Sequence, residues 1–301
     1  MEYKGLKDLS TFGEFHPLVT TTYYVLAIGL TMFSNRPDVL IISTLVAAIY
    51  QFVIKGAKSM KTTGIMAVSV LVFTTLINGL FTHNGETVLF YIDTNRVTLE
   101  AILYGATMSL MIIGVITWFA SFNEIMTSDK LIYIFGKMAP VLGLVISMIF
   151  RFIPLLKRRY EDISVGQDCM GRKDVSGFVN KSKLATKKVS ILIAWSLESS
   201  IESADSMSAR GYGLKGRTSF HLFKWEKKDV LAMIYFGITG AIAITLFAFG
   251  YGKMLFYPKI DLSFGGWQSV ALCIDLVLLF AAPIVIDLFG EYRWRKLDLT
   301  M

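Results

Sequence analysis

The sequence predicts an all-α integral membrane protein with about six transmembrane helices and two long cytoplasmic helices. Of its 301 residues, 54% are hydrophobic and only 18% are charged, and the mean hydropathy is +0.56. A soluble domain carries about 25% charged residues. The apolar residues also lie in long runs without Asp, Glu, Lys or Arg, which the short elements of a soluble core do not need. This composition excludes a soluble enzyme.

Uncharged runs mark the predicted spans, because a helix needs about 20 apolar residues, with a range of about 17 to 25, to cross the hydrocarbon core. Five such runs cover residues 15–35, 39–54, 62–85, 101–123 and 231–252, and a sixth apolar stretch, residues 267–288, is interrupted by Asp275. We therefore expect four spans within an N-terminal membrane part, residues 1–139, and two within a C-terminal membrane part, residues 229–301. Residues 140–228 form a region of different character between them.

The distribution of charge predicts the topology. Residues 151–228 contain 16 Lys plus Arg against 8 Asp plus Glu, whereas the other residues contain 14 against 15. An excess of Lys and Arg marks the cytoplasmic side of a membrane protein. The short connections agree, because basic residues follow the second and the last span: Lys55, Lys58, Lys61, Arg293, Arg295 and Lys296. We expect both termini and the basic region in the cytoplasm.

The apolar run 138–150 does not fit this count of spans, since a full crossing there would move the basic region outside. We expect a helix that lies in or shallowly across the interface. A tilted span paired with the apolar run 189–197 would preserve the same topology.

Two helices are expected in the basic region. The first covers residues 155–170, because Pro154 precedes it and Gly171 follows it, as is typical of helix ends. The second covers about residues 184–210, is apolar early and polar late, and ends at Gly211 and Gly213. Neither stretch alternates apolar and polar residues as a strand would.

No cofactor or nucleotide site is expected in this chain. Cys169 and Cys273 lie far apart without a CxxC spacing, and the three histidines are scattered, which excludes a disulfide framework, an iron–sulfur site and a zinc ribbon. The glycine pattern 211–216 follows a helix rather than a strand, and the pattern 166–173 lacks the Lys-Ser/Thr pair of a phosphate loop. If ATP drives this protein, partners must hydrolyse it.

The order of segments in the basic region is characteristic. After four spans come Arg151-Phe-Ile-Pro154, a charged helix that ends near Gly171, a helix that ends in Ala209-Arg210-Gly211, and then Gly216-Arg217-Thr218. This order resembles the transmembrane T component of energy-coupling factor transporters. These bacterial vitamin and metal importers also contain two ABC-type ATPases and a substrate-binding S component. The resemblance covers residues 15–229, and Ala-Arg-Gly is its sharpest match.

The resemblance implies a subunit of the bacterial cell membrane that is not an enzyme. In the family, two coupling helices end in Ala-Arg-Gly or Ala-Arg-Ser, and each end docks in a groove on one ATPase. Motion of the ATPases then passes through the membrane part to the S component, which topples to release its cargo. The resemblance assigns ATPase coupling to Ala209, Arg210 and Gly211. The implied partners are the two ATPases, the S component and the bilayer, with no nucleic acid.

The first coupling motif departs from the family pattern. It reads Cys169-Met170-Gly171, so methionine replaces the arginine. Either Arg172 supplies the charge from the next position, or Met170 fills an apolar groove with its flexible thioether. The difference suggests two unlike ATPase subunits.

Asp275 supports an alternative function. It lies within the last predicted span, where a charged residue costs about 2.5–3.5 kcal/mol on translocon scales. In the alternative, the chain is a self-sufficient secondary transporter or channel with Asp275 in the transport path. The sequence lacks the inverted repeats of that class. The first four spans also contain no second intramembrane carboxylate, which favours a structural Asp275 that is hydrogen-bonded to a neighbouring helix.

Overall fold

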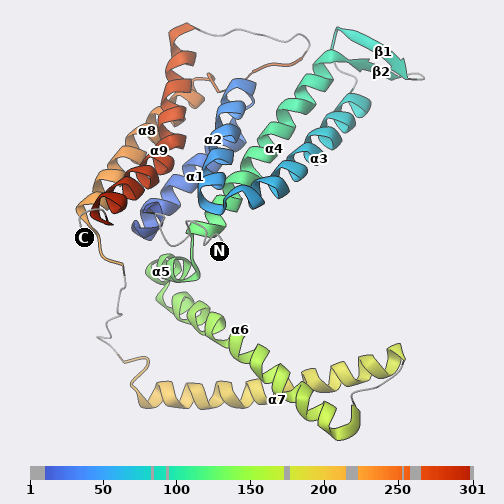
Figure 1. Ribbon diagram of the computed structural model, residues 1–301, viewed down its shortest axis with the longest axis vertical. Coiled ribbons are helices and arrows are strands. Elements are labelled where there is room, and N and C mark those ends of the chain that lie inside the picture. Colours follow the sequence, from blue (N-terminus) through green and yellow to red (C-terminus); the bar gives the residue numbers. More distant parts are fainter. Residues whose placement is uncertain are drawn as a thin grey trace. The chain divides into compact units, whose positions relative to one another are not determined.

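The structure is a computed structural model that describes residues 11–82, 85–92, 95–172, 177–214, 223–252, 254–257 and 266–298. Almost all of the described chain is helical, with one two-stranded sheet (Figure 1). The predicted all-α membrane fold is confirmed. The chain forms two compact units: the membrane unit comprises the described residues within Met1–Thr127 and Phe223–Met301, and the crossed-helix unit comprises those within Ser128–Leu222.

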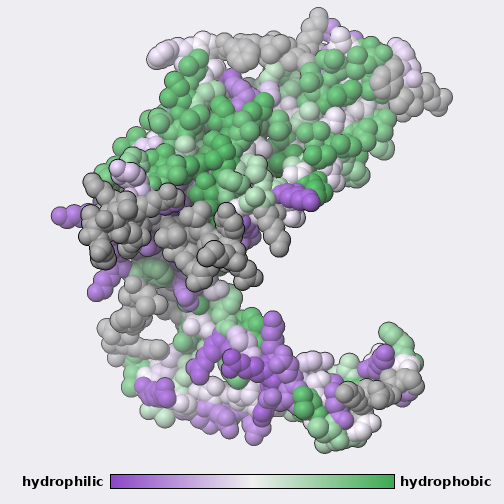
Figure 2. All heavy atoms as spheres, viewed as in Figure 1, coloured by the Kyte–Doolittle hydropathy of each residue, from purple (hydrophilic) through white to green (hydrophobic). Residues whose placement is uncertain are grey.

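Six long helices build the membrane unit. They are α1 (Pro17–Phe33), α2 (Pro37–Lys55), α3 (Ala57–Phe81), α4 (Leu99–Ile125), α8 (Lys227–Ala248) and α9 (Gly266–Asp298). Five of them contain an apolar segment long enough to cross a membrane, and α1 is an apolar helix of 17 residues, the lower limit of about 17 for a span. Each predicted span therefore corresponds to a helix. Hydrophobic side chains gather over this unit in Figure 2.

The short turn between α1 and α2 contains Arg36 and leads directly into α2. Pro37 is the first residue of that helix, where its missing N–H removes no intrahelical bond. The guanidinium of Arg36 donates to both carboxylate oxygens of Asp38, at 3.1 and 2.6 Å. Its Nη1 also donates to Ser269 Oγ at 2.9 Å and to the Tyr251 carbonyl at 3.1 Å. The turn thus ties α2 to α9.

Aromatic side chains fill the core of the membrane unit. Tyr23, Trp118 and Phe280 are fully buried, and Trp118 lies against the other two with ring centroids 5.9 and 5.7 Å apart. Polar bonds cross the same core: Tyr23 Oη donates to the Phe280 carbonyl at 3.1 Å, and Trp118 Nε1 donates to Ser43 Oγ at 3.0 Å. Together they join α1, α2, α4 and α9.

A short antiparallel hairpin, β1 (Val88–Ile92) and β2 (Asn95–Thr98), connects α3 to α4. The sequence analysis did not predict it, because nine residues in two strands leave little room for a periodic pattern. Thr98 ends the hairpin and caps α4, since its Oγ1 accepts from the Ala101 amide at 3.4 Å.

The crossed-helix unit contains α5 (Ser128–Met138), α6 (Pro140–Gln167), a π-helical turn (Asp168–Arg172) and α7 (Phe178–Ala209). The helices α6 and α7 cross each other (Figure 1). Hydrophilic side chains gather over much of this unit (Figure 2), in keeping with its basic sequence. The helix α7 begins six residues earlier than predicted, because Gly177, with φ 93°, ends the preceding connection.

The prediction of separate helices over residues 138–150 and 155–170 is wrong. Residues 140–150 and 155–167 belong to one helix, α6, which starts at Pro140 and contains Pro154 in its interior. Met138 ends α5, and residues 168–170 lie in the π-helical turn. An interior proline removes one backbone hydrogen bond and costs about 3 kcal/mol. The sequence therefore favours a helix that starts after Pro154 over one that continues through it. Near the start of α6, Gly143 approaches Gly136 of α5 so closely that a Cβ on Gly143 would lie 2.4 Å from the Gly136 Cα.

Candidate functional site

The end of α7 is a regular glycine-terminated cap. Ala209 is the last helical residue, Arg210 follows with φ −85° and ψ 10°, and Gly211 has φ 78°. The Gly211 amide donates to the Ser208 carbonyl at 3.0 Å, and the Tyr212 amide donates to the Met207 carbonyl at 3.0 Å. These two bonds define a Schellman motif, which needs a residue that tolerates positive φ. The motif presents the exposed Arg210 at the turn.

The first helix end has the same local backbone. Met170 has φ −79° and ψ 16°, and Gly171 has φ 77° and ψ 19°. The sequence alignment of Cys169-Met170-Gly171 with Ala209-Arg210-Gly211 therefore has a structural counterpart. The exposed side chains differ: Cys169 offers a thiol, and Met170, which is 68% exposed, offers a thioether in place of a charge.

Parts of the predicted motif region lie outside the described structure. Only the backbone of Arg172 is described, as the last residue of the π-helical turn. Residues 216–218, which carry Gly-Arg-Thr, and the histidines His83 and His221 fall in undescribed segments. The assignment of a compensating charge to Arg172 stays a prediction.

Contacts of Arg159 and of Lys188 hold α6 and α7 together where they cross. The guanidinium carbon of Arg159 lies 5.1 Å from the ring centroid of Trp195, a cation–π distance. On the next turns, the Lys188 ammonium donates to Ser164 Oγ and lies 3.9 Å from a carboxylate oxygen of Asp168. Lys188 is 9% exposed. Because Asp168 immediately precedes Cys169 and Met170, this contact ties the first motif to α7.

The sequence analysis missed these crossing residues. Lys188 stands in a lysine-rich stretch, 181–188, in which nothing distinguishes it from Lys187. The contacts join residues 20 to 36 positions apart, so they become visible only when the crossing is known. Trp195 was the one available signal, since a tryptophan in a largely polar helix needs an apolar or cationic partner.

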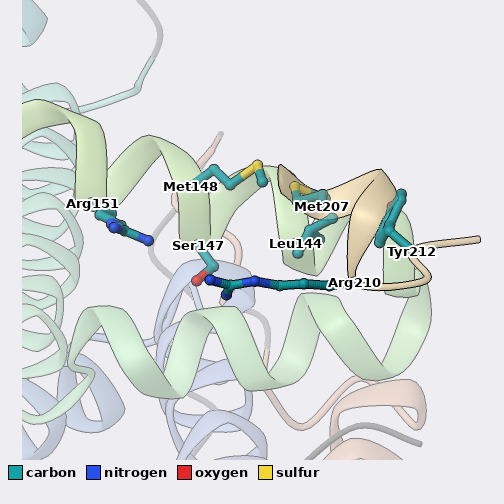
Figure 3. A pocket seen from close by; sticks show the side chains of 7 residues that line it. All are labelled: Leu144, Ser147, Met148, Arg151, Met207, Arg210 and Tyr212. Atoms are coloured by element: carbon teal, nitrogen blue, oxygen red, sulfur yellow. The ribbon is translucent and has the colours of Figure 1, made fainter. Parts of the chain in front are cut away.

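Arg210 lies against α6. It lines a groove of about 320 Å³ together with Arg151, Ser147, Leu144, Met148, Met207 and Tyr212. In Figure 3 the Arg210 side chain extends along α6 toward Ser147, and Arg151 points toward the same space from the opposite end. The sequence analysis used Arg151 only as the start of a motif, and the structure brings it together with Arg210.

Asp275 of α9 is 9% exposed. Its Oδ2 has no hydrogen-bond partner among the described residues. The nearby phenol of Tyr235 donates instead to the Leu278 carbonyl at 2.9 Å. Within the described ranges no group of three His, Cys, Asp or Glu side chains is placed to hold a metal ion.

Comparison with known proteins matches residues 15–222 to the family described as cobalt transport protein (CbiQ). Three similar proteins are each named energy-coupling factor transporter transmembrane protein EcfT. The protein from Lactobacillus helveticus is 28% identical over 150 residues, 49% of this chain and 51% of its own. That from Streptococcus equi is 28% identical over 210 residues, 65% of this chain and 75% of its own. The Bacillus subtilis protein is 27% identical over 209 residues, 65% of this chain and 76% of its own. The chain thus spans about half the length of the first relative and three quarters of the other two.

Proposed function

The chain belongs to the cobalt transport protein family, as the transmembrane T component of an energy-coupling factor transporter, and we propose that it couples two ABC-type ATPases to a substrate-binding S component. It is a multi-pass membrane protein. In the proposed mechanism the ends of α6 and α7 dock on the ATPases, and the membrane unit passes their motion to the S component.

The observation that carries this proposal is the pair of matching helix ends. Arg210 and Met170 each precede a glycine of φ near 78°, so each side chain is exposed at the tip of a sharply ending helix. Arginine suits a joint of this kind, because its planar guanidinium is always charged and binds a carboxylate through two parallel hydrogen bonds. Orientation as well as distance is fixed by such a pair.

The two tips favour two unlike ATPases. An ATPase groove that receives Arg210 requires a carboxylate, whereas one that receives Met170 requires an apolar wall, unless Arg172 supplies the charge. In this proposal ATP is hydrolysed in the partners, and this chain has no catalytic role. We place it in the bacterial cell membrane with both termini and the crossed-helix unit in the cytoplasm, on the charge distribution. The alternative of a self-sufficient transporter that uses Asp275 is not favoured by the family.

Purification of the native complex tests the proposal. We expect an affinity-tagged chain, extracted in mild detergent from its own cells, to bring down two different ABC-type ATPases and one small membrane protein. Mass spectrometry would identify them, and a tagged unrelated membrane protein from the same cells is the control. A chain that purifies without ATPases under conditions that keep its transport activity would contradict the proposal.

A further inference from the structure

We propose that Arg151 of α6 completes the Arg210 site, so that a single carboxylate of the ATPase is held by one guanidinium from each of the two crossed helices. The inference rests on the proposed docking role of Arg210 and adds a second binding residue from a different helix.

The geometry places both arginines at one site. They line two adjoining grooves together: the groove of about 320 Å³ with Ser147 and Tyr212, and a neighbouring groove of about 330 Å³ on the polar side of α7. Both side chains are exposed, and they point into the same space from opposite ends (Figure 3). An acceptor that enters this space meets a fork-shaped donor on either side.

The charges at this site call for an anion. In the part of the chain that the structure describes, no ion pair joins Arg151 or Arg210 to a carboxylate, and no acidic residue lines the first groove. Glu202 lines the second groove and is exposed. Two guanidiniums that face one space repel each other, whereas a carboxylate between them attracts both. Such charge-assisted bonds are about twice as strong as neutral ones.

The lining favours a protein carboxylate over a lipid phosphate. Beside the two arginines, the second groove is lined on the α7 side by Ser199, Glu202, Ser203 and Ser206. Met207 of α7 and Met148, Phe152 and Leu155 of α6 complete the lining of this groove. An acyl chain would meet the three serines and the Glu202 carboxylate along one side, whereas a hydrated protein segment that carries Asp or Glu fits them. The apolar side chains of Leu144, Met148 and Met207 in the first groove can cover the methylene stem of that carboxylate residue.

A carboxylate held in this way would be bonded to α6 and α7 at once. The ATPase would then move both helices about their crossing, rather than pull on the tip of α7 alone. Arg151 is therefore a binding residue whose loss changes ATPase affinity and leaves the fold of the free subunit unchanged.

The test measures the affinity of the purified full-length subunit in nanodiscs for its purified ATPase pair. The variants are Arg151→Gln, Arg210→Gln, the double variant, Arg151→Lys, and Arg158→Gln as the matched control. Arg158 is an exposed arginine of α6 that does not line either groove. Thermal unfolding of each subunit without ATPases checks its fold, and each measurement is made in phosphatidylcholine and in phosphatidylglycerol discs.

We expect Arg151→Gln to raise the Kd about tenfold or more, as loss of a charged hydrogen-bonded contact does, with Arg158→Gln near the unaltered value. Arg151→Lys should recover part of the affinity. The double variant should lose less than the product of the two single losses, because both arginines share one carboxylate.

Three results would overturn the inference. If Arg210→Gln weakens binding and Arg151→Gln behaves like Arg158→Gln, Arg210 acts alone and the proposed function stands. If neither arginine matters, the proposed docking role fails together with the inference. If the effect of Arg151→Gln appears only in phosphatidylglycerol discs, the two arginines hold a lipid phosphate.

Discussion

Met170 and Arg210 have the same backbone conformation at the ends of two different helices. Their φ and ψ angles, −79° and 16° against −85° and 10°, agree within a few degrees, and each is followed by a glycine of φ 77° or 78°. The two helix ends therefore share one backbone motif but present different side chains. In the proposed docking, the chemical difference between a thioether and a guanidinium would decide which ATPase surface each end fits.

The glycine at the second end sets the first prediction. Gly211→Ala should distort the Arg210 tip, because a positive φ costs an ordinary residue about 1–2 kcal/mol and the added Cβ would lie 3.0 Å from Leu214 Cδ1. We expect reduced recovery of ATPases with the tagged subunit and little change in its melting temperature, since the site is exposed. Gly166→Ala is the control, because a Cβ there meets nothing within 4 Å. Equal ATPase recovery from both variants would show that the tip geometry does not matter.

The first end yields a prediction on Arg172. If Arg172 carries part of the charge that Met170 lacks, Arg172→Ala should reduce uptake moderately, and less than loss of Arg210 does, because a residue beyond the helix-ending glycine is less constrained. Adding Met170→Arg to that variant should restore uptake by returning arginine to the usual position. Substrate uptake into whole cells measures both. Unaltered uptake with Arg172→Ala would leave Met170 or shape alone to make the contact.

The crossing of α6 and α7 gives a third prediction. Lys188→Ala removes the ammonium that donates to Ser164 and lies 3.9 Å from a carboxylate oxygen of Asp168. The packing of α6 against α7 should therefore weaken. We expect ATP hydrolysis by the complex to continue while uptake per ATP falls severalfold. Lys187→Ala removes a charge from the exposed neighbouring position and should leave this ratio unchanged. A ratio that falls equally in both variants would point to general charge loss.

Most of the membrane unit could be predicted from sequence, and the crossed-helix unit only in part. Uncharged runs identify spans because hydrocarbon admits little else. The observed helices agree with the predicted spans within about five residues at each end, except that α9 continues ten residues beyond the predicted end at residue 288. In α6 the local signal of Pro154 was misleading, since the helix continues through this proline. The helix ends at Gly171 and Gly211 could be predicted from sequence, because these glycines adopt a conformation that other residues avoid. The contacts of Arg151, Arg159 and Lys188 depend on how two helices cross, which no local pattern specifies.

The fourth prediction concerns topology. Single cysteines at Lys183 and Lys296, in a cysteine-free background, should resist an impermeant thiol reagent in intact cells, because the excess of basic residues predicts that both positions lie in the cytoplasm. A cysteine at Glu86, next to the hairpin, should react. Labelling of position 183 from outside would overturn the placement of the crossed-helix unit and, with it, the coupling role.

The central claim is that Arg210 joins this chain to an ATPase, and the most direct measurement is the amount of ATPase that copurifies with the Arg210→Glu variant. The substitution sets two like charges together where a bidentate pair is proposed. We predict loss of one ATPase contact and of uptake, with partial recovery in Arg210→Lys, whose point charge lacks the fork geometry. Recovery of both ATPases at the unaltered level with Arg210→Glu, together with unaltered uptake, would contradict the account.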